Sequence, residues 1–539
     1  MVESGGSSYI IIYLIVLLLV ALPVILLEMQ YGLFYRRNAV SCFEKAGRTP
    51  GRFFGWQQML GTGLLCVYYL ALIAWVLSTL VTAFVPSFFE QLGTKDSGFF
   101  ESKILNKLGT KDSGFFELKI LNNDPSLVVN SAESSAVNKI DFSFGFSWLI
   151  FASCFILILL AGFVVYTGIK GLEKVNMILV PGLFLLMFGL LAYSLTLKNS
   201  FEGVKYLFQF EGHQFARPNI WYGALKQAIF STGIMFGTFI VFSKSSDIKI
   251  DKANDALIVI SADTLIGVMS GIIVVSIVSH NYGTNPDVLN NSITINDKLK
   301  DFFDKGESAG STLVFVHLPV IFLKMNETVS FTLGSFGLGN FLFIFFLLAL
   351  FFAAFTSLIS LLEVFIDAIT ENFKSMTRGN SIFTWSLFCL LMTVFYSLSI
   401  GGSLIDEQDS AILLTATIAG LVQVLIFTNH KNFSKVIRTN EKHSYLKLSP
   451  GNWFVKVCRY IVTPILFIMS IYGFMQFFSL DYYFTQLFST DGFWGFLRSG
   501  KSLTLTLPKI MSWVMMAWFF FFVTFLTFNR NENLSFSKK

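Results

Sequence analysis

The sequence predicts an all-α polytopic membrane protein. Hydrophobic residues make up 54% of the chain, charged residues only 14%, and the mean hydropathy is +0.65. These values exclude an ordinary soluble domain. Apolar runs of about 20 residues recur, and each is long enough to cross the roughly 30 Å hydrocarbon core of a bilayer as a helix. The runs are too long and too continuous for the strands of a membrane barrel, so helices are expected throughout.

Eleven apolar runs are expected to span the membrane. They cover residues 8–34, 57–86, 147–169, 175–197, 219–244, 255–280, 339–371, 382–400, 410–428, 453–477 and 507–528. Two long loops, 87–146 and 281–338, mix acidic and basic residues nearly evenly. The second loop contains a helical patch at 298–303 and an apolar stretch at 313–321. That stretch is too short to span, so we expect it to lie on the helix bundle.

The distribution of basic residues between the loops predicts the orientation of the chain. The segment after the first run and the loop before the tenth are both strongly basic. Their basic residues are Arg36, Arg37, Lys45, Arg48 and Arg52, and Lys431, Lys435, Arg438, Lys442 and Lys447. Loops rich in Lys and Arg remain in the cytoplasm, so the C-terminus is expected inside and, with eleven spans, the N-terminus outside. Because few residues and no basic ones precede the first run, a further helix upstream of this sequence is expected.

One apolar run carries a stripe of small and oxygen-bearing side chains. Ala353, Thr356, Ser357 and Ser360 are spaced so that they share one face of a helix. Such a face points at protein rather than at lipid. Two interpretations remain open: close packing of two helices through small residues, or a set of hard oxygen ligands for a cation at mid-membrane depth.

The run 219–244 is interrupted at its centre. Residues 230–237 contain two glycines and two hydroxyl residues where a plain span would continue with Leu and Phe. The glycines could serve tight packing. Alternatively the helix is broken, which exposes backbone N–H and C=O groups and is tolerated in a membrane only beside protein or a cavity. The ends of the two half-helices would then offer positive potential to an anion and free carbonyl groups to a cation.

A carboxylate lies within the next run, at Asp263. At that depth an ionised carboxylate costs several kcal/mol unless it is paired, solvated or bound to a cation. It either binds a cation or is a protonated, hydrogen-bonded acid with a raised pKa. Two further acids, Glu28 and Glu363, lie nearer the cytoplasmic ends of their runs, and structural hydrogen bonds are expected for them.

Motifs of the main enzyme classes are absent from the sequence. There is no phosphate-binding loop, no HExxH motif and no paired Cys and His ligands. The net charge of +5 is spread over loops, so nucleic acid is not an expected partner. An enzyme is therefore not expected, and no cofactor is implied.

Several motifs, taken in order, resemble the neurotransmitter:sodium symporter family, particularly its bacterial amino-acid transporters. They are Gly5 to Tyr9 with Tyr13 and Ala21 to Glu28; Val67 to Tyr69 with Trp75; Gln227 with Phe230 and Ser231; Asp263 to Leu265 with Ser270 and Gly271; Leu313 to Val316 with Leu318 and Pro319; and Phe351 to Glu363. The resemblance covers nearly the whole chain.

The resemblance implies a leucine-transporter-type 5+5 inverted-repeat fold. The eleven runs would correspond to the family's second to twelfth helices. Residues 1–200 would then hold the remainder of the first repeat, residues 201–430 the second repeat, and residues 431–539 two C-terminal helices.

The resemblance also implies roles for individual residues. One sodium site would use the carbonyl group of Ala353 and the hydroxyl groups of Thr356 and Ser357, and a second would use Ser231 and Asp263; oxygen donors suit such a hard ion. The substrate-binding residues would be Leu65, Tyr69, Phe230, Gly233, Phe236 and Leu361. Among them, the Tyr69 hydroxyl would bind a substrate carboxylate and Phe230 would form an aromatic lid. Asp409 would be the acidic half of an extracellular gate whose arginine partner belongs to the family's first helix.

The expected function is sodium-coupled symport of amino acids or related small amines across the plasma membrane by alternating access. The alternative is a transport-inactive chain, either a remnant of such a symporter or a mis-started gene model. Gly267 stands where chloride-dependent members of the family carry serine, and Asp263 already supplies a fixed negative charge. The resemblance therefore implies that transport does not require chloride. Met235 stands where the family often has glycine. Because methionine is larger, the sequence does not predict the size of the substrate-binding pocket.

Overall fold

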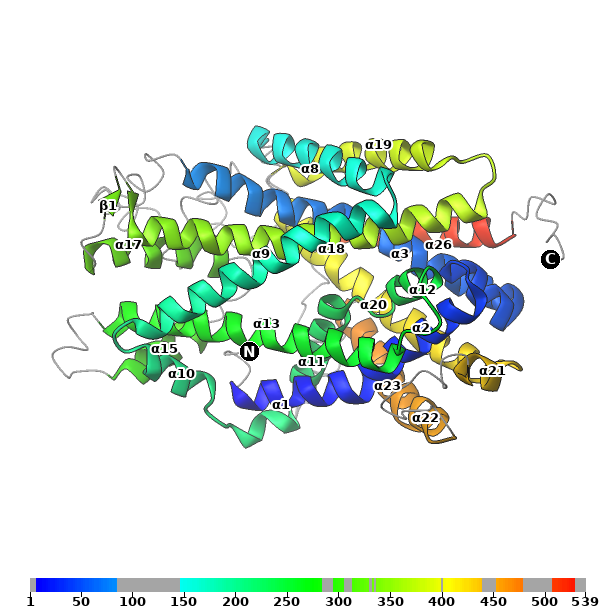
Figure 1. The fold of residues 1–539 in the computed structure, drawn as a ribbon, viewed down its shortest axis with the longest axis horizontal. Helices are drawn as coiled ribbons and strands as arrows, with labels where there is room; N and C mark the ends of the chain where they lie inside the picture. Colours follow the sequence, from blue (N-terminus) through cyan, green and yellow to red (C-terminus); the bar gives the residue numbers. More distant parts are fainter. Residues whose placement is uncertain are drawn as a thin grey trace, which may run out of the picture.

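The computed structural model describes residues 6–84, 146–283, 294–304, 313–328, 332–333, 336–398, 401–438, 452–477 and 507–528. The described residues form a bundle whose long helices run roughly along one axis (Figure 1). The expected loop 87–146 lies outside the described residues except for its last residue.

The bundle is built from the following elements. The α-helices are α1 Ser7–Val16, α2 Leu22–Tyr35, α3 Ala39–Ala83, α8 Trp148–Tyr166, α9 Ile169–Thr196, α10 Ser200–Leu207, α11 Pro218–Thr232, α12 Thr238–Lys244, α13 Lys252–Gly283, α15 Ile295–Asp304, α17 Leu318–Thr328, α18 Leu338–Asn372, α19 Arg378–Tyr396, α20 Gly401–Thr428, α21 Phe433–Arg438, α22 Asn452–Val457, α23 Thr463–Phe477 and α26 Leu507–Phe528. The remaining elements are the π-turns η1 Leu17–Ala21, η5 Leu313–His317 and η7 Cys458–Val462, the 3-10 helix η4 Gly212–Ala216, and the antiparallel strands β1 Thr332–Leu333 and β2 Phe336–Gly337.

Ten of the eleven expected spans are found as continuous helical segments long and apolar enough to cross a membrane within the described chain. The eleventh, 219–244, is divided into α11 and α12, so the predicted interruption is confirmed. The π-turn η1 continues α1 into α2 as one span, Ser7–Tyr35. The expectation of an all-helical polytopic protein is confirmed.

The largest boundary error concerns the second span. The helix α3 begins at Ala39 rather than near residue 57, and it runs for 45 residues with a bend at Arg48, where φ is 55°. The residues of α3 before residue 57 include charged residues and Pro50. Their low hydropathy therefore did not identify them as part of a helix. In the loop 281–338, the expected helical patch is α15, and the expected apolar stretch forms η5 and the start of α17, which packs on α18.

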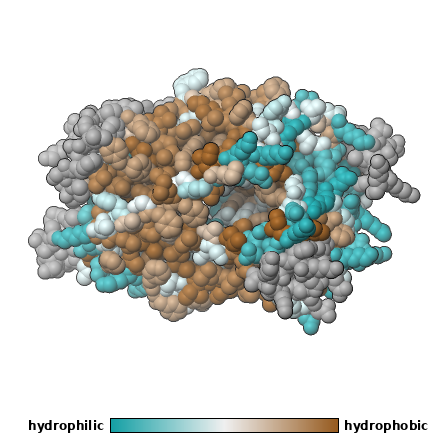
Figure 2. All heavy atoms as spheres, viewed as in Figure 1, coloured by the Kyte–Doolittle hydropathy of each residue, from teal (hydrophilic) through white to brown (hydrophobic). Residues whose placement is uncertain are grey.

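The outer surface of the bundle is apolar over a broad belt. Phe163, Ile178 and Leu185, on α8 and α9, are 74%, 74% and 76% exposed. Such large exposed side chains are out of place in water but suit contact with lipid. Figure 2 shows this belt in brown, with hydrophilic residues gathered toward the end of the bundle where α12 and α21 lie in Figure 1. The chain is therefore a multi-pass membrane protein.

Glycine allows two helices to approach closely where the broken segment meets α2. A Cβ atom built on Gly32 would lie 2.2 Å from the carbonyl oxygen of Ile240 in α12. Because that contact is with backbone, no side-chain rotation can relieve it. Gly32 thus sets the distance between α2 and α12.

We expect Gly32→Ala to lower the free energy of unfolding by about 1–3 kcal/mol, because the added methyl group forces α2 and α12 apart. The measurement is thermal unfolding of the purified protein in detergent. The matched control is Gly189→Ala in α9, where an added Cβ meets nothing within 4 Å. Equal melting temperatures for the two variants would show that the close approach is unimportant.

Candidate ion and substrate site at a broken helix

The site is organised by a break of five residues between α11 and α12. Three of these residues have left-handed backbone conformations: Gly233 has φ 74°, Met235 φ 64° and Gly237 φ 75°. Glycine adopts these angles at little cost, whereas methionine does so only when its surroundings impose it. The two glycines that suggested a break in the sequence, Gly233 and Gly237, are therefore two of the three residues that turn the chain there.

The backbone groups released by the break are bonded by side chains from neighbouring helices. The buried carboxylate of Glu28 on α2 accepts a hydrogen bond from the Met235 N–H at 3.0 Å and another from Gln423 of α20 at 3.0 Å. The hydroxyl group of Thr62 on α3 donates to the Phe236 carbonyl at 3.0 Å. The expected structural role of Glu28 is confirmed, and its particular role is to hold the break.

The first group of oxygen atoms lies where α11 ends. The hydroxyl group of Ser231 donates to Oδ2 of Asp263 on α13 at 3.2 Å. The Tyr13 hydroxyl on α1 donates to the same carboxylate oxygen and lies 3.0 Å from the Ser231 hydroxyl oxygen. The structure thus brings Ser231 and Asp263 together, as one sodium site requires. It adds Tyr13, whose hydroxyl could have been noticed in the sequence as a polar group in an apolar run.

The second group lies on one face of α18. The Thr356 hydroxyl donates to the carbonyl oxygens of Phe352 at 3.0 Å and Ala353 at 2.9 Å, and the Ser357 hydroxyl donates to Ala353 O at 3.1 Å. Because their protons point back to the helix, the lone pairs of both hydroxyl oxygens are free to face a cation. Ser357 is exposed rather than packed against a helix, which favours the ligand interpretation over close packing.

Several of the expected substrate-binding residues lie around these two groups. The Tyr69 side chain on α3 lies near the Ser357 hydroxyl, which places this expected substrate-binding residue close to the second oxygen group. The rings of Phe230 and Phe236 stack across the break with centroids 6.0 Å apart. Leu65 on α3 and Leu361 on α18 are both buried, and these two helices pack against each other. Phe230 is partly exposed, as a lid over a binding site requires.

The bulk of Met235 is accommodated by a glycine. Met235 is fully buried, and a Cβ atom built on Gly420 of α20 would lie 2.4 Å from its sulfur atom. The side chain therefore occupies the space that a side chain at residue 420 would need. This pairing of Met235 with Gly420 links residues far apart in the sequence, so the sequence alone could not reveal it.

Asp409, the expected acidic half of a gate, has two partners on neighbouring helices. Its Oδ1 atom accepts a hydrogen bond from the Tyr68 hydroxyl at 3.0 Å, and Oδ2 forms an ion pair with Lys226 of α11. The expected partner was an arginine from another helix, so Lys226 is a finding of the structure. The signal for it was a lysine in an apolar run, one helical turn before Phe230.

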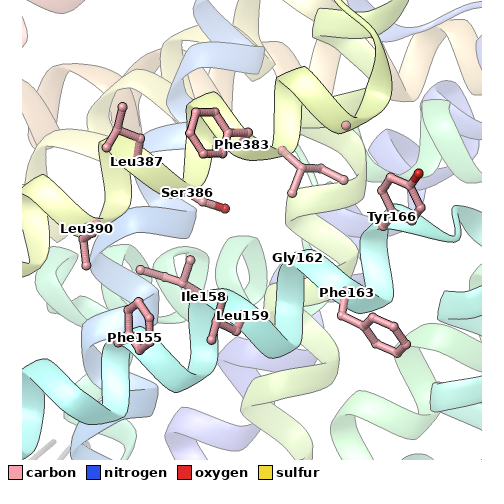
Figure 3. Close-up of a pocket in the computed structure, with 12 residues that line it drawn as sticks. Phe155, Ile158, Leu159, Gly162, Phe163, Tyr166, Phe383, Ser386, Leu387 and Leu390 are labelled. Carbon is pink, nitrogen blue, oxygen red and sulfur yellow. The ribbon is translucent and has the colours of Figure 1, made fainter.

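A separate groove of about 410 Å³ lies between α8 and α19 (Figure 3). Its lining includes Phe155, Leu159, Phe383 and Leu387, and no charged side chain. Ser386 places one hydroxyl group in it. The groove is part of the lipid-facing belt, and the hydroxyl groups of Ser386 and Tyr166 are the only polar side-chain groups of its lining.

A helix broken at mid-span, with oxygen donors beside the break, defines a class of membrane transporter in which irregular backbone lines the binding site. The chain belongs to the sodium:neurotransmitter symporter family, whose model matches residues 1–526. The predicted resemblance is confirmed, as is the prediction that the chain is a transporter rather than an enzyme.

Individual relatives are distant but cover most of the chain. An uncharacterized sodium-dependent transporter of Methanocaldococcus jannaschii is 25% identical over 86% of this chain and 82% of its own length. Sodium-dependent nutrient amino acid transporter 1 of Drosophila melanogaster is 23% identical over 73% of this chain and 60% of its own length. The crystal structure of MhsT in complex with L-phenylalanine superposes with a TM-score of 0.63 at 22% identity, covering 87% of this chain and 92% of MhsT. This structural likeness confirms the fold.

Removing the carboxylate of Glu28 is expected to destabilise the break. In Glu28→Ala the Met235 N–H and the Gln423 amide lose their acceptor, and each buried unsatisfied group costs about 1–3 kcal/mol. Glu28→Gln keeps one carbonyl oxygen and is expected to lose less. Denaturation of both variants in detergent measures the difference. A Glu28→Ala protein as stable as the wild type would contradict the role assigned to this carboxylate.

Proposed function

We propose that the protein is a sodium-coupled symporter of amino acids. The observation that carries this proposal is the convergence of Tyr13, Ser231 and Asp263 at the end of a broken membrane helix. A carboxylate and two hydroxyl groups are ligands suited to a small hard cation. Support comes from the family and from the names of relatives, which include a nutrient amino acid transporter and a structure with bound L-phenylalanine.

In this proposal sodium binds to the two oxygen groups and prepares the substrate site. Ser231 and Asp263 ligate one ion, and the Ala353 carbonyl, Thr356 and Ser357 ligate the other. The Tyr69 hydroxyl, which lies near Ser357, then donates to the substrate carboxylate. Because Tyr69 lies near Ser357, an ion held at the second oxygen group would sit beside the hydroxyl that binds the substrate carboxylate. Sodium at the second group therefore favours the geometry that binds substrate.

The substrate side chain would lie among Leu65, Phe236 and Leu361, with Phe230 closing over it. Gly233, at the break, leaves room beside the substrate. The sodium gradient and the membrane potential would drive uptake, the latter contributing about 2.3 kcal/mol per charge for each 100 mV. We place the protein in the plasma membrane with its C-terminus in the cytoplasm, because the loops rich in Lys and Arg then lie inside.

Sodium-dependent binding of amino acids is expected to weaken when a ligand oxygen is removed. Thr356→Val removes one hydroxyl group at nearly constant volume, and Asp263→Ala removes the only carboxylate of the first oxygen group. We expect the sodium concentration for half-maximal amino-acid binding to rise about tenfold or more in each variant, because an interaction with a charged partner is lost. Equilibrium binding in detergent over a sodium titration measures it.

The control for this titration is Ser386→Ala, which removes a hydroxyl group from the lipid-facing groove and leaves both oxygen groups intact. Its sodium dependence should match that of the wild type. Unchanged sodium dependence in both Thr356→Val and Asp263→Ala would contradict the assigned ligands.

Transport is expected to continue when chloride is replaced by gluconate. The Asp263 carboxylate provides a fixed negative charge beside the proposed cation, so a mobile anion is not needed to balance it. The measurement is sodium-driven uptake of a radiolabelled amino acid into liposomes. Abolition of uptake on chloride removal would refute chloride independence while leaving sodium coupling intact.

A further inference from the structure

The span that begins with α22 is longer than the hydrocarbon core of a bilayer. It runs from Trp453 to Phe477, a length of 25 residues. As a helix it measures about 37 Å, against roughly 30 Å of hydrocarbon. Its charged residues, Lys456 and Arg459, both lie in the first two turns. These turns therefore lie at the level of the lipid headgroups, at the same end of the bundle as α12 and α21 (Figure 1).

One face of α22 and η7 is exposed and carries aromatic and basic side chains. Trp453, Lys456 and Tyr460 are spaced at i, i+3 and i+7, so they share a helix face. Trp453 is 49% and Tyr460 75% exposed, whereas Phe454 on the opposite face is buried. Arg459 lies at the edge of the exposed face and is itself exposed. Trp and Tyr are enriched where hydrocarbon meets headgroups, because their rings combine an apolar body with a polar atom.

Arg459 joins this face to the end of α20. Its Nη2 group donates to the Thr428 carbonyl at 2.8 Å and to Oδ1 of Asn429 at 2.7 Å. Both acceptors are neutral, and the Nε and Nη1 groups take no part in these bonds. Lys431 follows Asn429 by two residues and is exposed, so it belongs to the same surface. We call Lys431, Lys456 and Arg459 the α22 basic cluster.

The charge of the α22 basic cluster is not balanced by a carboxylate of the described chain. The stretches 425–438 and 452–462 contain no acidic residue. The elements that pack on η7 include α2 and α20. The acid of α2 is Glu28, which is buried and bonded at the break, and the acids of α20 lie in its first three turns, far from Thr428.

Other basic side chains at this end of the bundle do have carboxylate partners. The ion pairs are Arg37 with Glu371, Arg52 with Glu44, Lys244 with Asp367, and Lys252 with Asp255. The α22 basic cluster therefore differs from its surroundings: it presents net positive charge at the membrane edge, next to exposed aromatic rings.

We propose that the α22 basic cluster binds the headgroup of an anionic phospholipid. The planar guanidinium of Arg459 offers paired N–H donors to a phosphate group, and Lys431 and Lys456 add charge that attracts an anionic headgroup. Trp453 and Tyr460 contact the region where the acyl chains begin. A zwitterionic phospholipid has the same chains and phosphate but no net charge, so it binds less tightly. The inference goes beyond sodium-coupled transport and does not depend on it.

Native mass spectrometry of the full chain in detergent tests this proposal. Phosphatidylglycerol and phosphatidylcholine with identical acyl chains are titrated separately, and the dissociation constant of each is measured. The wild type is expected to bind phosphatidylglycerol about tenfold or more tightly. Lys431→Gln and Lys456→Gln are each expected to weaken phosphatidylglycerol binding about fivefold, with phosphatidylcholine unchanged. Neither lysine forms a hydrogen bond that holds the described fold, so both variants are expected to fold normally.

Arg459 also bonds to the end of α20, so its role in lipid binding is tested with a pair of variants. Arg459→Lys keeps the charge and is expected to weaken phosphatidylglycerol binding less than Arg459→Gln does. The matched control is Lys205→Gln, which removes an exposed positive charge from α10, where Lys205 pairs with Glu202. This control should bind both lipids as the wild type does.

Two further arms separate a lipid from other anions and from bulk charge. Glycerol 1-phosphate, which carries the phosphate without acyl chains, should not displace phosphatidylglycerol. Raising the salt concentration should weaken phosphatidylglycerol binding and leave phosphatidylcholine binding unchanged, because salt screens charge.

The proposal is overturned by any of four results. They are equal affinity of the wild type for the two lipids, wild-type affinity for phosphatidylglycerol in the Lys431→Gln and Lys456→Gln double variant, an equal loss in Lys205→Gln, and displacement of the lipid by glycerol 1-phosphate. The measurement contains neither sodium nor amino acid, so its failure would leave the proposed transport function untouched.

Discussion

The structure depends on a constraint that a membrane imposes on any broken helix: backbone groups released from helical hydrogen bonds must find other partners. Here Glu28 accepts from the Met235 N–H, and Thr62 donates to the Phe236 carbonyl. A buried unsatisfied group costs about 1–3 kcal/mol. These side chains of α2 and α3 therefore stabilise the break, together with Gln423 of α20, which donates to Glu28, and the Thr238 hydroxyl, which donates to the Gly233 carbonyl. The helix α11 ends before Gly233, whose left-handed backbone (φ 74°) lets its N–H bond to the Ile229 carbonyl.

The position of the break determines the chemistry beside it. Because α11 stops at Thr232, the Ser231 hydroxyl can meet the Asp263 carboxylate from α13 and the Tyr13 hydroxyl from α1. The second oxygen group needs no break, since Thr356 and Ser357 are adjacent on one face of a continuous helix. One proposed cation site is thus made by tertiary structure and the other by helical spacing.

These two origins explain how much could be predicted from the sequence. The spans and the shared helix face on α18 were predicted correctly, and the break was one of the two interpretations left open for residues 230–237. Hydropathy, paired glycines and a spacing of three to four residues are local signals. The early start of α3 was missed because charged residues and Pro50 interrupt its apolar pattern. Lys226 with Asp409, and Met235 against Gly420, were missed because they depend on which helices become neighbours, and no spacing within one segment encodes that.

The central claim is that oxygen atoms of this chain bind alkali cations at two groups, one at the end of α11 and one on α18. Its most direct test is a crystal structure of the protein with thallium(I), a heavy monovalent cation that can be located by anomalous scattering. The account predicts one peak at the oxygens of Ser231 and Asp263 and another at Ala353, Thr356 and Ser357. Anomalous peaks only at other places would contradict this claim. So would the absence of a peak at both groups under conditions where thallium replaces sodium in supporting amino-acid binding.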